Sequence, residues 1–222
     1  MVSAVLFDLD ETLISRAGAI RAFVAEQYRR FEHQLEGIDG PTYAERFLVM
    51  EDNGRIPKDQ LYPAFVEALG ISSVDAPTLL EDYRANYPNH AVLNRGARET
   101  IAAIRADGRL TGIITNGNDR VQKGKLAATG LHDLFDVVVV SEAVGLRKPD
   151  PAIFALATSD LGVRLDDALF VGDNPEVDIL GAAHAGMQTA WYRNGEIWPA
   201  ELPRKADADI DHLHEVLHFP GR

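Results

Sequence analysis

The chain has 222 residues, of which 46% are hydrophobic and 25% charged, and its formal net charge is −12. This length allows one sizeable core, or a core domain that carries a smaller inserted one. The chain contains no cysteine, which excludes disulfide bonds, zinc sites with thiolate ligands and a cysteine nucleophile. The acidic balance argues against non-specific binding of nucleic acid, because that binding requires a basic surface.

The sequence favours a cytoplasmic protein without a membrane anchor. No apolar run reaches the ~18 residues that a membrane span needs. The first apolar stretch has no basic region before it and ends at Asp8, too early for a signal peptide. We therefore expect no membrane or nucleic-acid partner, and a monomer or a homodimer.

Five short apolar runs predict buried strands, at residues 4–7, 110–114, 137–140, 168–171 and 189–192. The runs are continuous rather than alternating, which is typical of parallel strands covered on both faces. Helical periodicity lies between them, over 97–104, 121–129 and 151–161, and each of these stretches is followed by a glycine. Strands that alternate with helices predict a doubly wound, Rossmann-like α/β sheet.

The region from about Ser15 to Asn94 breaks this alternation. It shows no convincing strand, only amphipathic helical stretches such as 19–31 and 58–69. The simplest account is a helical subdomain inserted after the first strand. We therefore expect an α/β core domain formed by 1–14 and 95–222, and a helical domain formed by 15–94, with a hinge at each crossing.

Carboxylates follow two of the predicted strands. Asp8 and Asp10 come after the first strand, and Asp173 comes after the fourth, with Asp178 five residues later. In an open α/β sheet the carboxyl ends of the strands form the ligand-binding rim, so these segments should meet there. Like charges repel, and such a cluster persists mainly where a cation balances it. Oxygen ligands without cysteine or clustered histidine favour Mg²⁺.

Groups that can bind an anion follow the second and third predicted strands. Thr115, Asn116 and Gly117 follow the second strand and offer a hydroxyl and neighbouring N–H groups. Lys148, held by the following Pro149, comes after the third strand and supplies a positive charge of limited mobility. An anion site that faces a metal site suits phosphoryl transfer, in which catalysis is mostly positioning and charge neutralisation.

Four motifs in this order resemble those of the haloacid dehalogenase superfamily. They are Asp8-Leu9-Asp10-Glu11-Thr12, Thr115-Asn116, Lys148-Pro149, and Gly172-Asp173 with Asp178. The resemblance spans the chain, and four motifs in register are specific where any one alone is weak. It implies that the inserted helical region is the small α-helical cap of that superfamily. Within the superfamily the chain looks most like nucleoside monophosphatases and sugar-phosphate phosphatases.

The resemblance implies a Mg²⁺-dependent phosphoric monoester hydrolase that forms an aspartyl-phosphate from a small phosphorylated metabolite. Asp8 would be the nucleophile, and Asp10 would be the general acid and then the general base. Mg²⁺ would be bound by Asp8, the backbone carbonyl of Asp10, Asp173 and, directly or through water, Asp178. The groups at the phosphate would be Thr115, Asn116, Gly117 and Lys148.

Two of these acids have simpler structural alternatives. Asp10 would then only cap the turn after the first strand. Asp178 would then only stabilise the first turn of the helix after Pro175, where an acid favours the helix dipole.

Other functions remain open at this point. A 2-haloacid dehalogenase of the same superfamily resembles this chain in its nucleophile, but lacks a second acid at the Asp10 position and needs no metal. A phosphomutase shares every motif and differs in its product. A binding or regulatory module on this scaffold should have lost at least one acid. The segment His214-Glu215-Val216-Leu217-His218 matches a zinc-protease pattern, but Ile210, Leu213 and Leu217 favour a packed amphipathic helix.

Overall fold

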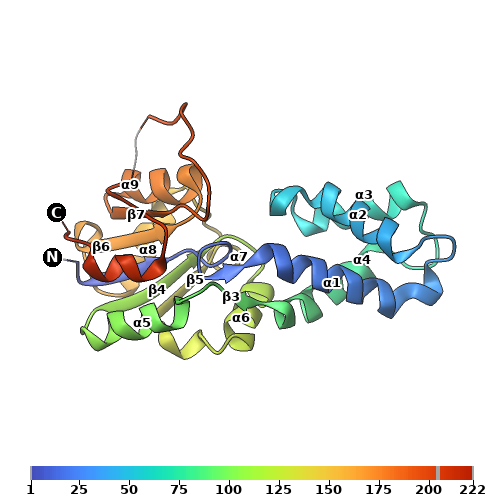
Figure 1. Ribbon diagram of the computed structural model, residues 1–222, viewed down its shortest axis with the longest axis horizontal. Helices are drawn as coiled ribbons and strands as arrows, with labels where there is room; N and C mark the ends of the chain where they lie inside the picture. The colour runs from blue at the N-terminus through green and yellow to red at the C-terminus, as the bar shows by residue number, and fades with distance from the viewer. Residues whose placement is uncertain (1, 204–205, 222) are drawn as a thin grey trace. The chain divides into compact units, whose positions relative to one another are not determined.

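The structure is a computed structural model that describes residues 2–203 and 206–221. The chain forms two compact units, one from Met1–Ser15 and Leu93–Arg222 and the other from Arg16–Val92. From the sequence we expect the two domain boundaries after residues 14 and 94. Figure 1 shows a sheet with helices in the larger unit and helices alone in most of the smaller one.

The sheet of the larger unit has six strands in the order β5-β4-β1-β6-β7-β8, and each neighbouring pair is parallel. The strands are β1 (Ala4–Phe7), β4 (Leu110–Thr115), β5 (Val137–Val140), β6 (Ala168–Gly172), β7 (Gln188–Tyr192) and β8 (Ala208–Ile210). All five predicted strands are present, and the edge strand β8 is additional. The prediction of a doubly wound, parallel α/β sheet is confirmed.

Helices connect these strands and cover the sheet. The connecting elements are α5 (Ala97–Ala106), α6 (Asp119–Ala128), α7 (Ser141–Val144), α8 (Pro151–Asp160), η6 (Pro175–Leu180) and α9 (Gly181–Ala185). The chain winds outward from β1 through β4 to β5, then returns to the other side of β1 at β6. Because crossovers between parallel strands are right-handed, this reversal places α5 and α6 on one face and α8 and α9 on the other.

One face of the sheet carries a buried apolar core. Leu6, Ile114 and Phe170 from three strands pack with Ile153 and Phe154 of α8. The rings of Phe154 and Phe170 meet edge to face, with their centroids 5.1 Å apart. This packing fixes the three central strands whose carboxyl ends lead into the polar residues described below.

The carboxyl ends of β4, β1 and β6 lie level with one another. Phe7 pairs with Ile113 on β4 and with Val171 on β6. The chain therefore leaves three adjacent strands at one rim, and the winding of the sheet reverses at this place. Open α/β sheets bind their ligands at such a switch point.

The segment with the zinc-protease pattern forms a 3₁₀-helical turn, η7 (Leu213–His218). Leu213 and Val216 are buried, whereas His214 and His218 are exposed. Among the described residues these histidines belong to no group that could hold a metal ion. The apolar side of η7 is therefore a packing surface.

The smaller unit is built from four main helices, α1 (Arg16–Phe31), α2 (Gly40–Glu51), α3 (Lys58–Leu69) and α4 (Ala76–Asn86). Asp39 and Asp75 cap α2 and α4 by accepting hydrogen bonds from the backbone of Thr42 and Thr78. At the crossings the two-residue strands β2 (Ile14–Ser15) and β3 (Val92–Leu93) pair with each other, which the sequence did not predict.

The centre of the smaller unit is aromatic, with one buried amide among the rings. Gln27 on α1 is fully buried, and its side-chain oxygen accepts hydrogen bonds from the hydroxyls of Tyr43 and Tyr62 at 3.0 and 2.9 Å. Its side-chain nitrogen donates to the Leu79 carbonyl oxygen and to Asp82. The amide thus satisfies polar groups that would otherwise be buried without partners.

In the part of the chain that the structure describes, no helix combines the length and the apolar character that crossing a bilayer demands.

Candidate active site

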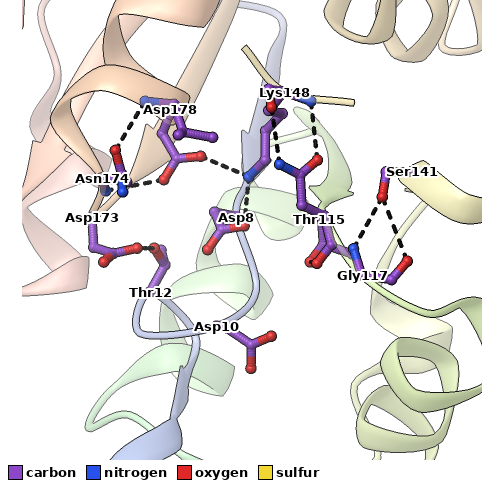
Figure 2. A network of polar contacts seen from close by, with 12 residues as sticks. Asp8, Asp10, Thr12, Thr115, Gly117, Ser141, Lys148, Asp173, Asn174 and Asp178 are labelled. Carbon is purple, nitrogen blue, oxygen red and sulfur yellow. Dashed lines mark hydrogen bonds and ion pairs between the residues drawn. The ribbon is translucent and has the colours of Figure 1, made fainter. Parts of the chain in front are cut away.

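Three carboxylates and one lysine converge at the rim of the sheet. Asp8 follows β1, Asp173 follows β6, and Asp178 lies in the π-helical turn η6. One carboxylate oxygen from each acid lies within 4.8 Å of the other two. Lys148 Nζ lies 2.6 Å from Asp8 Oδ1 and 2.6 Å from Asp178 Oδ1, as Figure 2 shows. Residues that are far apart in sequence therefore form one charged cluster.

Asp178 faces this cluster and is 2% exposed. Its second oxygen, Oδ2, accepts a hydrogen bond from the backbone N–H of Asn174 at 3.0 Å. A β-carbon built on Gly172 would lie 2.6 Å from that same oxygen, so the carboxylate occupies the space that a side chain at position 172 would fill. Asp178 therefore contacts both Lys148 and the backbone at the start of η6.

Asp173 is held by two donors. Thr12 Oγ1 donates to Asp173 Oδ1 at 3.2 Å, and Trp191 Nε1 donates to the Asp173 carbonyl oxygen at 2.7 Å. We interpret Thr12 from the sequence as a brace for the loop after Asp10. In the structure its hydroxyl links that loop to the acid after β6.

The charges in the cluster are not balanced by lysine alone. Burial, together with the nearby charge of Asp178, raises the pKa of Asp8 to about 7 against the pull of Lys148. Burial and the charges of Asp178 and Asp8 raise the pKa of Asp173 to about 9. Burial alone would lower the pKa of Lys148, but attraction to Asp178 and Asp8 outweighs it and raises the pKa. Lys148 therefore stays positively charged, but its single charge does not balance the three neighbouring carboxylates.

This imbalance and the donor set fit a hard divalent cation. Asp8, Asp173 and Asp178 offer only carboxylate oxygens, close enough together to share one ion. Mg²⁺ prefers such ligands, and its charge would relieve the repulsion that raises the two pKa values. Asp10 is predicted at the metal through its backbone carbonyl, and its side chain contacts Gln122 and Lys125.

Asn116 contacts the backbone next to the lysine. Its side-chain nitrogen donates to the Lys148 carbonyl oxygen at 3.0 Å, and its side-chain oxygen accepts from the Lys148 N–H at 3.0 Å. The sequence predicts Asn116 at the phosphate. In the structure its carboxamide bonds to the backbone of Lys148, which precedes a cis peptide bond to Pro149, and the place of Asn116 at the phosphate stays a prediction.

Thr115, the last residue of β4, and Gly117 lie on either side of Asn116. Thr115 is 1% exposed, and its hydroxyl accepts a hydrogen bond from Gln122 Nε2 at 2.6 Å. The backbone N–H of Gly117 donates to Ser141 Oγ at 3.0 Å (Figure 2). The turn predicted to bind an anion is thus held by side chains from α6 and α7.

Asp10 contacts two residues that the sequence analysis did not select. Lys125 Nζ lies 2.7 and 2.8 Å from the two oxygens of Asp10, and Gln122 Nε2 lies 3.0 Å from Oδ2. In the view of Figure 2, Asp10 lies on the other side of Asp8 from Lys148. The structure shows that Gln122 and Lys125 share the buried face of α6 with Val121 and Leu126, which the sequence pattern alone did not reveal. Polar residues at core positions of a helix indicate a specific partner.

Comparison with known proteins identifies the family. The family model of haloacid dehalogenase-like hydrolases matches residues 2–186. The chain belongs to this family. A glyceraldehyde 3-phosphate phosphatase of Methanopyrus kandleri is 32% identical over 98% of this chain and 96% of its own length. The pyrimidine 5'-nucleotidase YjjG of Escherichia coli is 33% identical over 84% of each chain.

Solved structures of this haloacid dehalogenase-like family have the same fold. A phosphatase from Thermococcus onnurineus aligns with a TM-score of 0.73 and 30% identity, covering 98% of this chain and 97% of that one. A 2-haloacid dehalogenase from Pseudomonas syringae pv. Tomato aligns with a TM-score of 0.71 and 28% identity, with the same coverage. The fold is therefore shared by both activities, whereas the curated relatives described above support a phosphoric monoester hydrolase.

Proposed function

We propose that this haloacid dehalogenase-like hydrolase is a Mg²⁺-dependent phosphatase that passes through an aspartyl-phosphate on Asp8. The convergence of Lys148 with Asp8 and Asp178, at 2.6 Å from each, supports the proposal most directly. This arrangement places a fixed cation beside a buried carboxylate at the ligand-binding rim of the sheet. Asp10, two residues after the nucleophile, adds the acid that phosphoryl transfer to an alkoxide requires.

In the first step a carboxylate oxygen of Asp8 attacks the phosphorus atom of the substrate. The bond between phosphorus and the ester oxygen breaks, and Asp10 gives its proton to the departing oxygen. The alcohol leaves and an acyl phosphate remains on Asp8. Lys148 balances negative charge on the phosphoryl oxygens and on Asp8 during this transfer.

In the second step water attacks the phosphorus atom of the acyl phosphate. Asp10, now a carboxylate, takes a proton from that water, and the bond between phosphorus and Asp8 breaks. Inorganic phosphate leaves, and both acids return to their starting states. One difficult hydrolysis is thereby divided into two easier displacements.

Asp8, Asp173 and Asp178 would hold the Mg²⁺ ion, together with the backbone carbonyl of Asp10 as the family resemblance implies. When bound, Mg²⁺ supplies positive charge that neutralises the phosphoryl oxygens and orients them for in-line displacement. Thr12 and Trp191 keep Asp173 in place for this role, and Asn174 does the same for Asp178.

The substrate we propose is a small phosphorylated metabolite, either a nucleoside monophosphate or a sugar or small-acid phosphate. The two curated relatives named above are a nucleotidase and a triose-phosphate phosphatase, one for each of these classes. The Arg16–Val92 unit, which we propose acts as the cap, would choose between them. A cap of this size leaves room for several related substrates.

A phosphate-release screen over a panel of phosphomonoesters, with and without Mg²⁺, tests the proposal when it is run beside Asp8→Asn. We expect release that depends on Mg²⁺ and falls by at least about 10³-fold in the variant. Labelled phosphate from the substrate should be trapped on the wild-type chain after acid quench and not on Asp8→Asn. Undiminished turnover in that variant would show that Asp8 is not the nucleophile.

Two further measurements separate the rivals within the superfamily. Dehalogenation of a 2-haloacid should survive chelation with EDTA, whereas phosphate release should not. A phosphomutase would return a rearranged sugar phosphate in place of free phosphate, and product analysis on the same panel detects it. Absence of both reactions and of phosphate release across the panel would favour a binding module.

A further inference from the structure

Helix α6 turns two polar side chains toward the rim of the sheet. Gln122 is 2% exposed and Lys125 is 4% exposed, while their neighbours Val121 and Leu126 fill ordinary core positions. A lysine is rarely buried unless it is paired, because removal of its charge from water is costly. The partner of Lys125 therefore indicates why a lysine stands there.

That partner is Asp10. Lys125 Nζ lies 2.7 Å from Oδ1 and 2.8 Å from Oδ2, and 2.8 Å from the side-chain oxygen of Gln122. One ammonium group thus holds both oxygens of a single carboxylate. Charge-assisted bonds of this kind are stronger than neutral ones and fix the orientation of the group that accepts them.

Gln122 links this pair to the turn after β4. Its side-chain nitrogen lies 3.0 Å from Asp10 Oδ2, 2.6 Å from Thr115 Oγ1 and 3.3 Å from the Asn116 carbonyl oxygen. These contacts therefore fix the position of the Asp10 carboxylate relative to the carboxyl end of β4. A contact with Lys125 alone would leave Asp10 free to move with helix α6.

The loop that carries Asp10 needs such support. Glu11, the next residue, adopts φ +63°, a conformation that a residue with a side chain seldom takes. The side chain of Asp10 is 26% exposed, so solvent would compete for its oxygens. A general acid must be aimed at the departing oxygen, and small errors in its position are costly to the rate.

We propose that Lys125, assisted by Gln122, is a positioning residue that aims the carboxyl group of Asp10 during proton transfer. The inference rests on the proposed function. We assign Lys125 no contact with substrate or phosphate, so it acts on the reaction only through Asp10. Its loss should therefore slow the proton-transfer steps and spare steps that need no proton.

The test compares Lys125→Met with Lys123→Met, two residues away on the same helix. Lys123 is 51% exposed in its side chain and pairs with Asp119, so its replacement should leave activity unchanged. Methionine is uncharged and unbranched, and it fills the space of the Lys125 side chain except for the terminal nitrogen. Thermal unfolding of both variants shows whether either change disturbs the fold.

The decisive readout is the dependence on leaving group. Phosphoryl transfer from p-nitrophenyl phosphate expels a stabilised phenolate and needs no acid, whereas transfer from an alkyl phosphomonoester does. In Lys125→Met we expect the first step with the alkyl ester to fall about 10²-fold, and that with the aryl ester to stay within about threefold of wild type. Because Asp10 also serves as the base in the second step, the aryl ester should show a burst of p-nitrophenol followed by slow turnover.

An equal loss of the first step for both esters, or no loss for either, would overturn the inference. Lys125→Arg, which keeps a bidentate cation, should recover more alkyl-ester turnover than Lys125→Met. If Lys125→Met unfolds, Gln122→Leu is measured in its place, with the same dependence on leaving group expected. Turnover that persists in Asp8→Asn would refute the proposed function itself. An inactive Asp8→Asn beside a fully active Lys125→Met would refute only the role of Lys125.

Discussion

Lys148 Nζ contacts Asp8 Oδ1 at 2.6 Å, and the two residues are 140 positions apart in the sequence. The same ammonium group lies 2.6 Å from Asp178 Oδ1, so one side chain joins segments that follow three different strands. Lys148 is 3% exposed, so its charge interacts with the two acids rather than with solvent. Lys148 therefore contributes both positive charge and structural cohesion at this rim.

Lys148→Met should lower both stability and activity. Removal of one member of a buried ion pair leaves the other charge uncompensated, and here Asp8 and Asp178 would both lose their cation. We expect the free energy of unfolding in Mg²⁺-free buffer to fall by about 3 kcal/mol, measured by urea denaturation. Added Mg²⁺ should restore part of that loss, and phosphate release should stay low. An unfolding curve identical to wild type without Mg²⁺ would contradict this role.

The stability of the metal-free protein should decrease as pH rises. Asp8 and Asp173 have pKa values of about 7 and about 9 in the folded chain, against 3.8 as the ordinary value. A folded state with raised carboxyl pKa values binds more protons than the unfolded chain, so this stability is complete below pH ~4 and is lost as pH rises toward the folded values. Thermal unfolding between about pH 5 and pH 9 measures it.

Mg²⁺ should correspondingly stabilise the protein more at high pH than at low pH. The ion competes with protons for the same carboxylates, so its effect on Tm should be larger near pH ~8.5 than near pH ~6. Asp173→Asn removes one of the two shifted acids and should flatten the pH dependence of the metal-free protein. A Mg²⁺-induced shift in Tm of equal size at both pH values would argue against binding at this cluster.

Gly172→Ala should weaken Mg²⁺ binding more than it lowers the stability of the fold. The new β-carbon would meet the carboxylate of Asp178 at 2.6 Å and force that side chain away. Displacement of a group at a metal site typically costs 10- to 100-fold in affinity, so we expect a rise of about tenfold in the Mg²⁺ concentration for half-maximal activity.

Gly18→Ala is the matched control for this substitution. Gly18 is exposed on α1, and a β-carbon there meets nothing within 4 Å. It should leave the Mg²⁺ requirement unchanged and raise helix stability by up to about 1 kcal/mol. A Mg²⁺ titration of Gly172→Ala that overlays wild type would show that Asp178 tolerates the displacement.

Gln27→Leu should destabilise the Arg16–Val92 unit. The leucine would leave the buried hydroxyls of Tyr43 and Tyr62 without their shared acceptor. Each unsatisfied buried group costs about 1–3 kcal/mol, so we expect a loss of about 2–4 kcal/mol in the unfolding free energy. Gln60→Leu, at an exposed position on α3, serves as the control. Equal unfolding free energies for the two variants would mean that the tyrosine hydroxyls find other partners.

The strands of the sheet were predictable because each is a continuous apolar run that ends at a turn or a polar residue. β8 was missed because Ala208–Ile210 is three residues long and carries Asp209 at its centre. β2 and β3 have two residues each, too few to show a period. Pairing between such short segments depends on how the chain crosses, which local pattern does not encode.

The site was predictable where motif residues follow strands, and less so where side chains choose between partners. The sequence brought forward Asp8, Asp173, Asp178 and Lys148, and these four lie together in the structure. The place of Asn116 at the phosphate stays a prediction, and the motif gave no sign that both ends of its carboxamide bond to the Lys148 backbone.

Lys125 shows the other limit. A lone lysine on a helix is normally at the surface, so the sequence analysis did not select it. Which face of α6 is buried depends on the packing of α6 against the rest of the unit. The partner of Lys125 therefore emerged only from the three-dimensional structure.

The position of β1 in the sheet has a consequence for synthesis of the chain. Ala4 pairs with Leu110 on one side and with Ala168 on the other, and translation makes both of these partners after it. A nascent chain that ends before β6 leaves one edge of this apolar strand open to association with other strands. Strand β1, which precedes the proposed nucleophile Asp8, is thus made before both of the strands that cover its edges, so chains that end before β6 should aggregate rather than retain partial activity.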